Sequence, residues 1–562
     1  MKKILIIGSG IAGLSCAVTG AQQGMHVILV SPMPSERSQS VMAAGGINAV
    51  LYPEKEGDSV SSHVQDTLKG GCFLENEEDV EELCREAFRI LNDLENMGAV
   101  FTRDENGKIA QRAFGGQSYR RTAFAGAATG KHIVSALIQK CRQYECQGKI
   151  ERKMGLHFYS ALIRNARCYG AVFLDGIGEK LEVIYADAVV MATGGQNTIF
   201  GKTTGSTLCD GYAVGKLFEQ GAKLRNLEFI QYHPTTIETY QKRLLITEAA
   251  RGEGGRLFYN KEGQRVYFME EMFGPKGNLM PRDIVSRCME ECPSQVYLDV
   301  TFLGDALIHS RLEEVYELCK KYRNLDITKE VIPVAPSVHF FMGGLWVDSN
   351  HETNIHRLYA VGECASKYHG ANRLGGNSLL AAMYSGRVAA RDIGYAEKES
   401  DVGLRFDGEI EELEQQLKKI KESKSNFSAV IVRNDLAEMM KENLGIIRNA
   451  HKINEGIETV DFYLKATDKI LYDKDVSLYV SCSLKNILLL AKAILESALF
   501  RCESRGAHVR SDYPQTNPEL SVSTIAEYKD GDVHIRYEAI PESNRRYRSD
   551  SDKGDKKSDC TN

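Results

Sequence analysis

The N-terminal segment constrains the fold more than any other part of the chain. Residues 3–7 (KILII) are predicted to form a buried parallel strand, and residues 26–30 (HVILV) a second one. Between them lie Gly8-Ser9-Gly10-Ile11-Ala12-Gly13 and an alanine-rich stretch typical of a helix. The glycines allow a tight turn and let the backbone approach a pyrophosphate, whose charge the helix N-terminus stabilises. The segment therefore predicts a βαβ unit that binds a dinucleotide.

The residues at the two ends of this βαβ unit argue against an NAD site and against a signal peptide. Ser31 follows the second strand, where an acidic residue usually binds the ribose of NAD, so an NAD site is disfavoured. The N-terminal lysines and the apolar run after them resemble a signal peptide. However, Gly8, Gly10 and Gly13 interrupt that run and no clear cleavage site follows. We therefore expect a strand here.

Length and composition bound the class of protein. A chain of 562 residues is long enough for several domains, and a net charge of −6 offers no basic face for nucleic acid. The 14 cysteines include no Cys-x-x-Cys spacing, so we expect no metal site. Free thiols in this number indicate that the protein is located in a reducing cytoplasm. The sequence contains no run of about 18 apolar residues, so we expect no membrane span. If the protein passes single electrons, we expect another polypeptide to carry the iron–sulfur clusters that conduct them.

Two later segments resemble nucleotide-associated strands, namely residues 186–195 (ADAVVMATGG) and residues 356–362 (HRLYAVG) with Glu363 after them. Because they lie far from residue 3, the first domain is predicted to be discontinuous. We expect its parts at 1–227 and 335–400, a capping domain at 228–334, a helical domain at 401–510 and a C-terminal segment at 511–562. The polar tail from about residue 543 is predicted to be disordered.

Arginine- and histidine-containing motifs recur in the middle of the chain. A dicarboxylate needs two anion sites, and Arg and His supply charge-assisted donors for them. The motifs are QYHPT (231–235), LITEAARGEGG (245–255), PRD (281–283), HFFMGGL (339–345), HGANRLGGNS (369–378) and ESRGAH (503–508). In this order the motifs resemble those of the flavoprotein subunits of succinate dehydrogenases and fumarate reductases. The resemblance runs from residue 3 to about residue 540.

The resemblance implies an α/β fold, in which a Rossmann-like FAD-binding domain is interrupted by an α+β capping domain and followed by a helical domain and a small C-terminal segment. It also implies FAD as cofactor. The residues that it assigns to FAD are Gly8, Gly10, Ile11, Ala12, Gly13, Ser38, Gln39, Ser40, Ala44, Gly45, Gly46, Thr193, Gly194, Gly195, Asp210, Glu363, Asn377, Ser378, Leu379 and Leu380.

The resemblance further implies a reaction between fumarate and succinate. Arg282 would give a proton to the substrate carbon, resupplied through Glu248 and Arg251. Other interpretations are open for single residues, because an E-x-x-R pair is often a weak surface ion pair and a lone His is more often structural. The residues that the resemblance assigns to substrate binding are Phe114, His233, Thr247, His339 and Arg373.

Gln39 departs from the family. It stands where the family has the histidine that bonds the flavin, so we expect non-covalent FAD and a bias towards fumarate reduction. Phe114 precedes a glycine pair at a position where the related L-aspartate oxidases have Glu. An apolar ring there leaves a substrate ammonium uncompensated. L-aspartate oxidase and a non-catalytic electron-transfer flavoprotein stay open as alternatives.

The partners and the location follow from the same resemblance. It implies an iron–sulfur subunit and allows a membrane anchor subunit. We expect a cytoplasmic protein that can lie on the inner face of the cell membrane through such partners. The electron source, whether a quinol, a thiol or another carrier, is left open.

Overall fold

The computed structural model describes residues 1–126, 128–177, 179–240, 242–397, 405–423, 427–467, 470–471 and 476–540. The tail from residue 543, which we expected to be disordered, lies outside the described residues.

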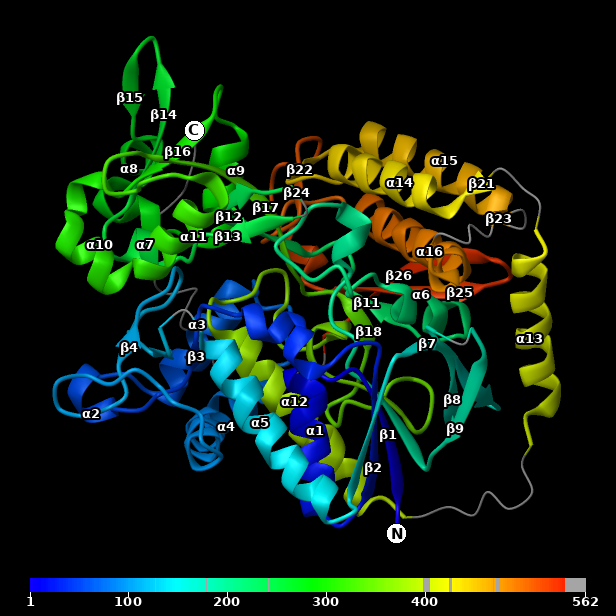
Figure 1. The fold of residues 1–562 in the computed structure, drawn as a ribbon. Coiled ribbons are helices and arrows are strands. Elements are labelled where there is room, and N and C mark those ends of the chain that lie inside the picture. The colour runs from blue at the N-terminus through cyan, green and yellow to red at the C-terminus, as the bar shows by residue number, and fades with distance from the viewer. Residues whose placement is uncertain are drawn as a thin grey trace.

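The predicted βαβ unit forms the centre of a five-stranded sheet with the order β19-β10-β1-β2-β6. All neighbouring strands in it are parallel. The two later segments supply β10 and β19, so distant parts of the chain build one sheet (Figure 1). Its strands are β1 (Lys3–Ile7), β2 (His26–Ser31), β6 (Ile150–Met154), β10 (Ala188–Met191) and β19 (Leu358–Ala360).

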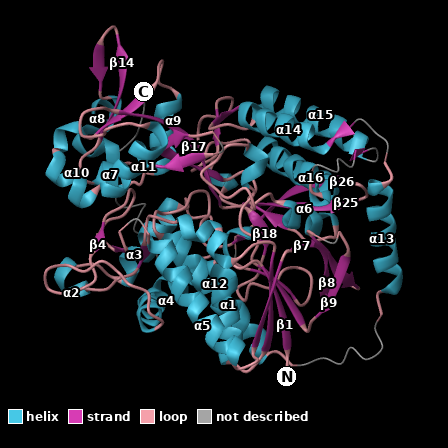
Figure 2. Cartoon of the chain, viewed as in Figure 1, coloured by secondary structure: helices cyan, strands magenta, loops and turns pink. Residues whose placement is uncertain are grey.

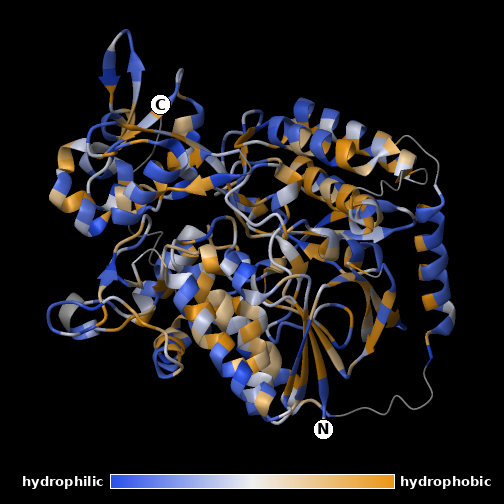
Figure 3. Ribbon diagram, in the orientation of Figure 1, coloured by the Kyte–Doolittle hydropathy of each residue, from blue (hydrophilic) through white to orange (hydrophobic). Residues whose placement is uncertain are grey.

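Both faces of this sheet are buried. Ile4 and Ile6 point into one core with α1 (Ile11–Gln22), α5 (Thr129–Cys146) and α12 (Asn377–Tyr395). Leu5 and Ile7 point into the other core, against β7 (Leu156–Arg164), β8 (Arg167–Asp175) and β9 (Leu181–Tyr185). Successive side chains of a strand face opposite ways, so a strand covered on both faces needs a continuous apolar run. Figure 3 shows these hydrophobic strands and the helices that pack on them.

A second body of α+β structure lies above this sheet (Figures 1 and 2). Its six-stranded sheet has the order β13-β12-β17-β16-β14-β15, and its apolar core runs from Ile237 to Val334. Its strands are β12 (Ile230–Glu238), β13 (Arg243–Leu245), β14 (Arg256–Lys261), β15 (Gln264–Val266), β16 (Val296–Asp299) and β17 (Ile332–Phe341). Its helices are α7 (Ala249–Gly252), α8 (Phe268–Phe273), α9 (Arg282–Glu290), α10 (Asp305–Arg311) and α11 (Glu313–Arg323).

This body coincides with most of the predicted capping domain. Strand β17, however, continues past residue 334 as far as Phe341. It therefore crosses the predicted boundary and brings His339 out of the cap towards the large sheet. The domain limits stay a prediction.

Helices dominate the chain after residue 405, in agreement with the helical pattern of its sequence. They are α13 (Asp407–Lys421), α14 (Ala429–Asn443), α15 (Ala450–Ala466) and α16 (Leu478–Phe500). Among the described residues, α16 alone is long and apolar enough to cross a membrane, although the sequence predicted no such run. Because 72% of its apolar window is buried inside the fold, α16 is accounted for as a core helix.

The remaining elements surround these bodies. A five-stranded sheet has the order β20-β18-β11-β25-β26, and its strands are β11 (Leu224–Arg225), β18 (Gly344–Trp346), β20 (Ala365–Ser366), β25 (Ser523–Lys529) and β26 (Asp532–Glu538). The other helices are α2 (Pro53–Glu56), α3 (Val60–Gly70), α4 (Glu77–Asn96) and α6 (Tyr212–Glu219). The short strands are β3 (Ile47–Asn48), β4 (Gln111–Arg112), β5 (Thr122–Ala123), β21 (Phe427–Ser428), β22 (Ile447–Arg448), β23 (Ile470–Leu471) and β24 (Val509–Arg510).

Candidate active site

A cavity of about 560 Å³ begins at the carboxyl ends of the parallel strands and extends to the cap. Ligands of open α/β sheets bind at this edge. The predicted cofactor residues that line the cavity are Gly8, Gly10, Ile11, Ala12, Ser38, Gln39, Ser40, Ala44, Gly45, Gly46, Thr193, Gly194, Gly195, Asp210, Glu363, Ser378 and Leu379. The other three, Gly13, Asn377 and Leu380, lie behind its wall.

The turn between β1 and α1 is tightly packed. Gly8 has a φ of 112°, and a Cβ on it would lie 2.2 Å from the carbonyl oxygen of Ala192. A Cβ on Gly13 would lie 1.9 Å from the carbonyl oxygen of Gly8. The role of Gly13 is therefore close packing of helix on strand, and the exposed backbone of the turn is left to approach a pyrophosphate.

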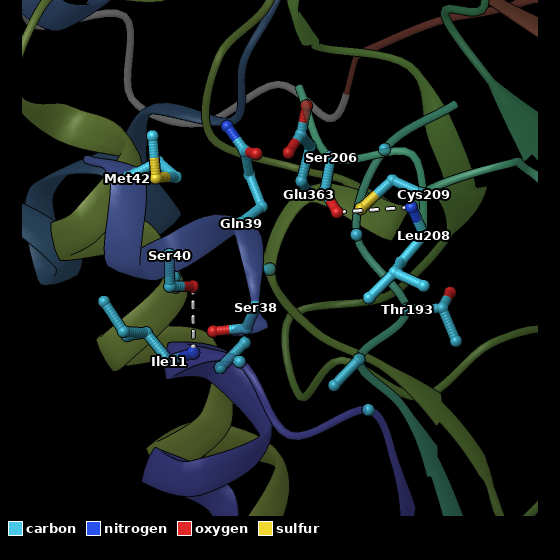
Figure 4. A pocket seen from close by; sticks show the side chains of 18 of the residues that line it. Ile11, Ser38, Gln39, Ser40, Met42, Thr193, Ser206, Leu208, Cys209 and Glu363 are labelled. Carbon is cyan, nitrogen blue, oxygen red and sulfur yellow. Dashed lines mark hydrogen bonds between the residues drawn. The ribbon is translucent and has the colours of Figure 1, made fainter. Parts of the chain in front are cut away.

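The loop after β2 supplies polar atoms to the same end of the cavity. Figure 4 shows Ser38, Gln39 and Ser40 on this loop, with the Ile11 N–H donating to Ser40 Oγ at 3.1 Å. Among the described residues, the buried Ser38 Oγ and Gln39 Oε1 have no hydrogen-bond partner. Unpaired buried polar atoms are rare in folded proteins. The hydroxyls and phosphates of a dinucleotide would satisfy them.

Glu363, in the turn after β19, also lines the cavity (Figure 4). Its Oε1 accepts the Phe341 N–H at 3.1 Å. Burial raises the pKa of Glu363 to about 7. A carboxyl group with such a pKa is partly protonated at neutral pH, so it can donate a hydrogen bond to a ligand hydroxyl or accept one from it. The glycine cradle, the unpaired polar atoms and this carboxyl group together fit an FAD molecule.

Phe114 forms an apolar wall of the cavity and is only 4% exposed. A Cβ on Gly375 would lie 3.1 Å from its ring, so the ring packs on the backbone before α12. The Arg112 guanidinium lies 5.5 Å from the Phe114 ring centroid and 4.3 Å from that of Phe124. Arg112 also donates to the Ala44 carbonyl at 2.8 Å. It thus holds the loop and the apolar wall in one arrangement.

Buried side chains fix the N-terminus of α12. Asn377 Oδ1 accepts from Asn48 Nδ2 at 2.7 Å and lies 3.0 Å from His63 Nε2, while Asn377 Nδ2 donates to Thr67 Oγ1 at 2.9 Å. Asn377 is fully buried in this network, so its side chain does not face the cavity. Its neighbour Ser378 does, and the helix dipole there favours negative charge in the cavity.

The three predicted proton-transfer residues meet in a buried row. Arg282 Nη2 lies 2.9 Å from Glu248 Oε2, and Arg251 Nη2 lies 3.6 Å from Glu248 Oε1. Burial raises the pKa of Glu248, but Arg282 and Arg251 outweigh burial and hold this pKa below its ordinary value. Arg282 lines the cavity, and its two partners lie behind it. The sequence therefore identified three residues that the fold brings together.

The residues of this row do not share one face of a helix. The short helix α7 begins at Ala249, with Glu248 as its N-cap, so Thr247 precedes it. The Gly115 N–H donates to Glu248 Oε1 at 2.8 Å. A backbone donor from a distant loop, rather than helical spacing alone, therefore fixes this carboxylate.

Gln231 was quoted in a motif but given no role. Its Oε1 accepts from Arg373 Nη2 at 2.8 Å and from Arg282 Nη1 at 3.3 Å. One amide oxygen therefore holds both guanidinium groups at the cavity wall. Burial and then Arg282 hold the pKa of Arg373 well below its usual range.

The two predicted histidines lie together. Their ring centroids are 5.2 Å apart, and Thr204 Oγ1 is 2.8 Å from His339 Nδ1. Burial, followed by the charge of Arg282, holds the pKa of both rings well below the ordinary value, so both are neutral at pH 7. His339 and Arg373 line the cavity, whereas His233 and Thr247 are buried behind it. His233 Nε2 has no partner among the described residues.

The cap end of the cavity thus gathers two guanidinium groups and neutral imidazoles, which fits a small dianion. Other lining residues carried no prediction. His369 lay within a quoted motif, and Ser31 had been noted as the strand end. No signal in the sequence pointed to the rest, which include Pro32, Met33, His157, Ser206, Leu208 and Tyr479.

Comparisons with known proteins agree over nearly the whole chain. Residues 3–379 match the FAD binding domain family, and residues 433–549 match the C-terminal family of fumarate reductase flavoproteins. The succinate dehydrogenase flavoprotein subunit of Bacillus subtilis is 36% identical, over 95% of this chain and 97% of its own length. The fumarate reductase flavoprotein subunit of Haemophilus influenzae is 33% identical, over 96% of this chain and 94% of its own length.

Solved structures give the same result. A variant of the FrdA chain of E. coli quinol fumarate reductase superposes with a TM-score of 0.88, at 30% identity, over 97% of this chain and 98% of that one. The predicted fold class is therefore confirmed. The chain belongs to the flavoprotein subunit family of succinate dehydrogenases and fumarate reductases.

Proposed function

We propose that this chain reduces fumarate to succinate with non-covalently held FAD. One observation carries the proposal: Arg282 lines the cavity while its guanidinium is bonded to the buried Glu248, with Arg251 on the other side of that carboxylate. A guanidinium that only bound a carboxylate would not need this buried continuation. FAD in the cavity would supply the hydride.

The substrate is held by its two carboxylates. Arg373 and His339 line the wall where one carboxylate would bind; His233, whose Nε2 is unpaired, and Thr247 lie behind the wall and would reach the other carboxylate when the cap closes. Neutral imidazoles and charged guanidinium groups can each donate hydrogen bonds to carboxylate oxygens. Closure of the cap would exclude water from the bound substrate.

The proton moves along the buried row. Arg282 gives a guanidinium proton to the substrate carbon that does not receive the hydride. The Glu248 carboxylate then takes a proton from Arg251, 3.6 Å away, and passes a proton through Oε2, at 2.9 Å, to Arg282; solvent returns the proton to Arg251. A carboxylate between two guanidinium groups can pass a proton with little separation of charge.

Gln39 supports the non-covalent cofactor and the direction. An amide lacks the imidazole nitrogen that bonds a flavin methyl carbon. The neighbouring Ser38 and Ser40 offer hydroxyls only. A histidyl link raises the flavin potential, so its absence favours fumarate reduction over succinate oxidation.

Turnover by the purified protein tests the function. We expect oxidation of a reduced dye by fumarate to be faster than reduction of an oxidised dye by succinate. L-aspartate should be a poor substrate, because the Phe114 ring offers no partner for its ammonium. Aspartate oxidation as fast as fumarate reduction would identify an aspartate oxidase, and no turnover of any of the three would leave an electron-transfer flavoprotein.

A further inference from the structure

The helical region after residue 405 supplies part of the cavity wall. Arg433 of α14 lines the cavity, as do Ser477, Tyr479 and Val480 at the start of α16. None of them belongs to the segment 3–379 that matches the FAD binding domain family. Helix α14 packs against residues 197–200 and α16 packs against α6 (Figure 1).

These side chains lie at the end of the cavity opposite the cap. A dinucleotide with its pyrophosphate at the α1 N-terminus places its adenosine beyond the carboxyl end of β2. Ser31 ends β2 and pairs with Met154 of β6, after which β7 brings His157 to the same place. The His157 and Tyr479 ring centroids are 4.4 Å apart. Tyr479 therefore marks the adenosine end.

Asp210 joins the two parts of the chain at this point. Its Oδ1 accepts the Tyr479 hydroxyl at 3.2 Å and the Tyr212 N–H at 3.0 Å. Its Oδ2 lies 3.7 Å from Arg433 Nη2, and the residue is only 8% exposed. Arg433 also donates to Ser483, but its buried Nε has no partner among the described residues.

We propose that Arg433 and Tyr479 are positioning residues that hold Asp210 against the adenosine half of FAD, so that the helical region is part of the cofactor site. A carboxylate fixed in this way can accept from a ribose hydroxyl or from the adenine amino group. The free Nε–H of Arg433 remains a donor towards the same end. The inference rests on FAD as the cofactor, and it is independent of the substrate and of the flavin linkage.

The first test compares FAD with FMN, which lacks the adenosine half. Arg433→Ala should weaken binding of FAD to the flavin-free chain by roughly tenfold or more, as the loss of a charged partner does. Tyr479→Phe should act in the same direction, and both should leave FMN binding unchanged. Arg433→Lys should restore part of the loss, because it keeps a cation beside Asp210.

Lys441→Ala is the matched control, since it removes a cation from the same helix at an exposed position outside the cavity. Unchanged FAD affinity in Arg433→Ala would overturn the inference. So would an equal loss of FAD and FMN affinity, which indicates general damage to the fold. The FAD and FMN binding measurements do not use fumarate, so a failure of the proposed fumarate reduction would be distinguished from a failure of this inference.

Hydrogen exchange of the whole chain tests the contact between the helical region and FAD, even if the flavin is covalently attached. FAD-loaded protein should exchange more slowly than flavin-free protein in peptides covering 429–443 and 477–484. Peptides from α15 (450–466), which contributes no lining residue, should be unaffected. Equal exchange of the 429–443 and 477–484 peptides in the two samples would refute the contact.

Discussion

At the scale of single residues, the chemistry of the site depends on a few groups whose surroundings set their charge. Arg282 is the clearest case, because it is buried, lines the cavity and is bonded to a carboxylate whose pKa lies below its ordinary value. An arginine is normally never deprotonated, but a donor to carbon needs proximity and rapid reprotonation rather than a pKa near 7.

Arg282→Lys separates proton donation from carboxylate binding. If Arg282 donates the proton, kcat for fumarate should fall by roughly 10³-fold or more while fumarate still perturbs the flavin spectrum. Arg311→Lys, at an exposed ion pair of the cap, is the control and should behave as the wild type. A near-normal kcat with a raised KM would show that Arg282 only binds substrate.

Gln39 predicts the fate of the flavin on denaturation. Acid precipitation of the purified protein should release all yellow colour into the supernatant, because no imidazole stands in the linking motif. The absorbance of the supernatant and of the washed pellet measures both fractions. A yellow pellet would contradict the prediction.

Glu363 predicts a pH dependence of stability in the flavin-free chain. Its pKa is raised by burial from 4.5 to about 7, so the folded state binds the proton more tightly than the unfolded state does. The stability linked to this proton is fully present below pH 4.5 and is lost as the pH rises to about 7. Over that window the free energy of unfolding should fall on the order of 1–3 kcal/mol relative to Glu363→Gln. Denaturant titrations of both proteins at pH 5 and pH 8 measure this difference, and parallel curves would rule it out.

At the scale of elements, the site is built where strands end and helices begin. The β1–α1 turn, the loop after β2 and the N-terminus of α12 meet at one edge of the sheet. The glycine pattern of the sequence located the first of these, and the family resemblance assigned residues 377–380, at the last, to the cofactor. The resemblance also assigned Gly13 to the cofactor. In the structure Gly13 lies in helix–strand packing and Asn377 in the buried network that orients α12, and their assignment to the cofactor stays a prediction.

Gly13→Ala tests the packing of α1 on β1. The added Cβ would lie 1.9 Å from the Gly8 carbonyl oxygen, a backbone atom that moves only if the turn opens. We expect a loss of about 2 kcal/mol or more in the free energy of unfolding, together with loss of bound flavin. Gly408→Ala is the control, because a Cβ there meets nothing within 4 Å. Equal stability of the two variants would show that the turn adapts.

At the scale of the whole molecule, the chain matches the FAD binding domain family over residues 3–379. Among the described residues, no group of His, Cys, Asp and Glu could hold a metal ion. The Bacillus subtilis relative is named as a flavoprotein subunit. A partner with its own clusters would provide a path for single electrons, and a small soluble carrier is the alternative.

Purification from the native cell distinguishes the two. We expect a cysteine-rich iron–sulfur protein to co-elute with this chain in constant ratio, and the pair to lie on the inner face of the membrane if an anchor subunit is present. Protein stoichiometry and iron content of the eluted fractions measure this. A clean monomer that is reduced directly by a small carrier would exclude the complex.

The sequence by itself determined the features that depend on neighbouring residues. Glycine spacing and apolar runs located β1, α1 and β2, and short motifs located Arg282, Glu248, Arg251, His339 and Arg373. Only the tertiary structure decided the contacts between distant segments. Gln231 holds two guanidinium groups from other elements, and Tyr479 meets Asp210 across 269 positions of the chain. The physical reason is that a backbone pattern reports the local conformation, whereas a side-chain partner is chosen by how the domains pack.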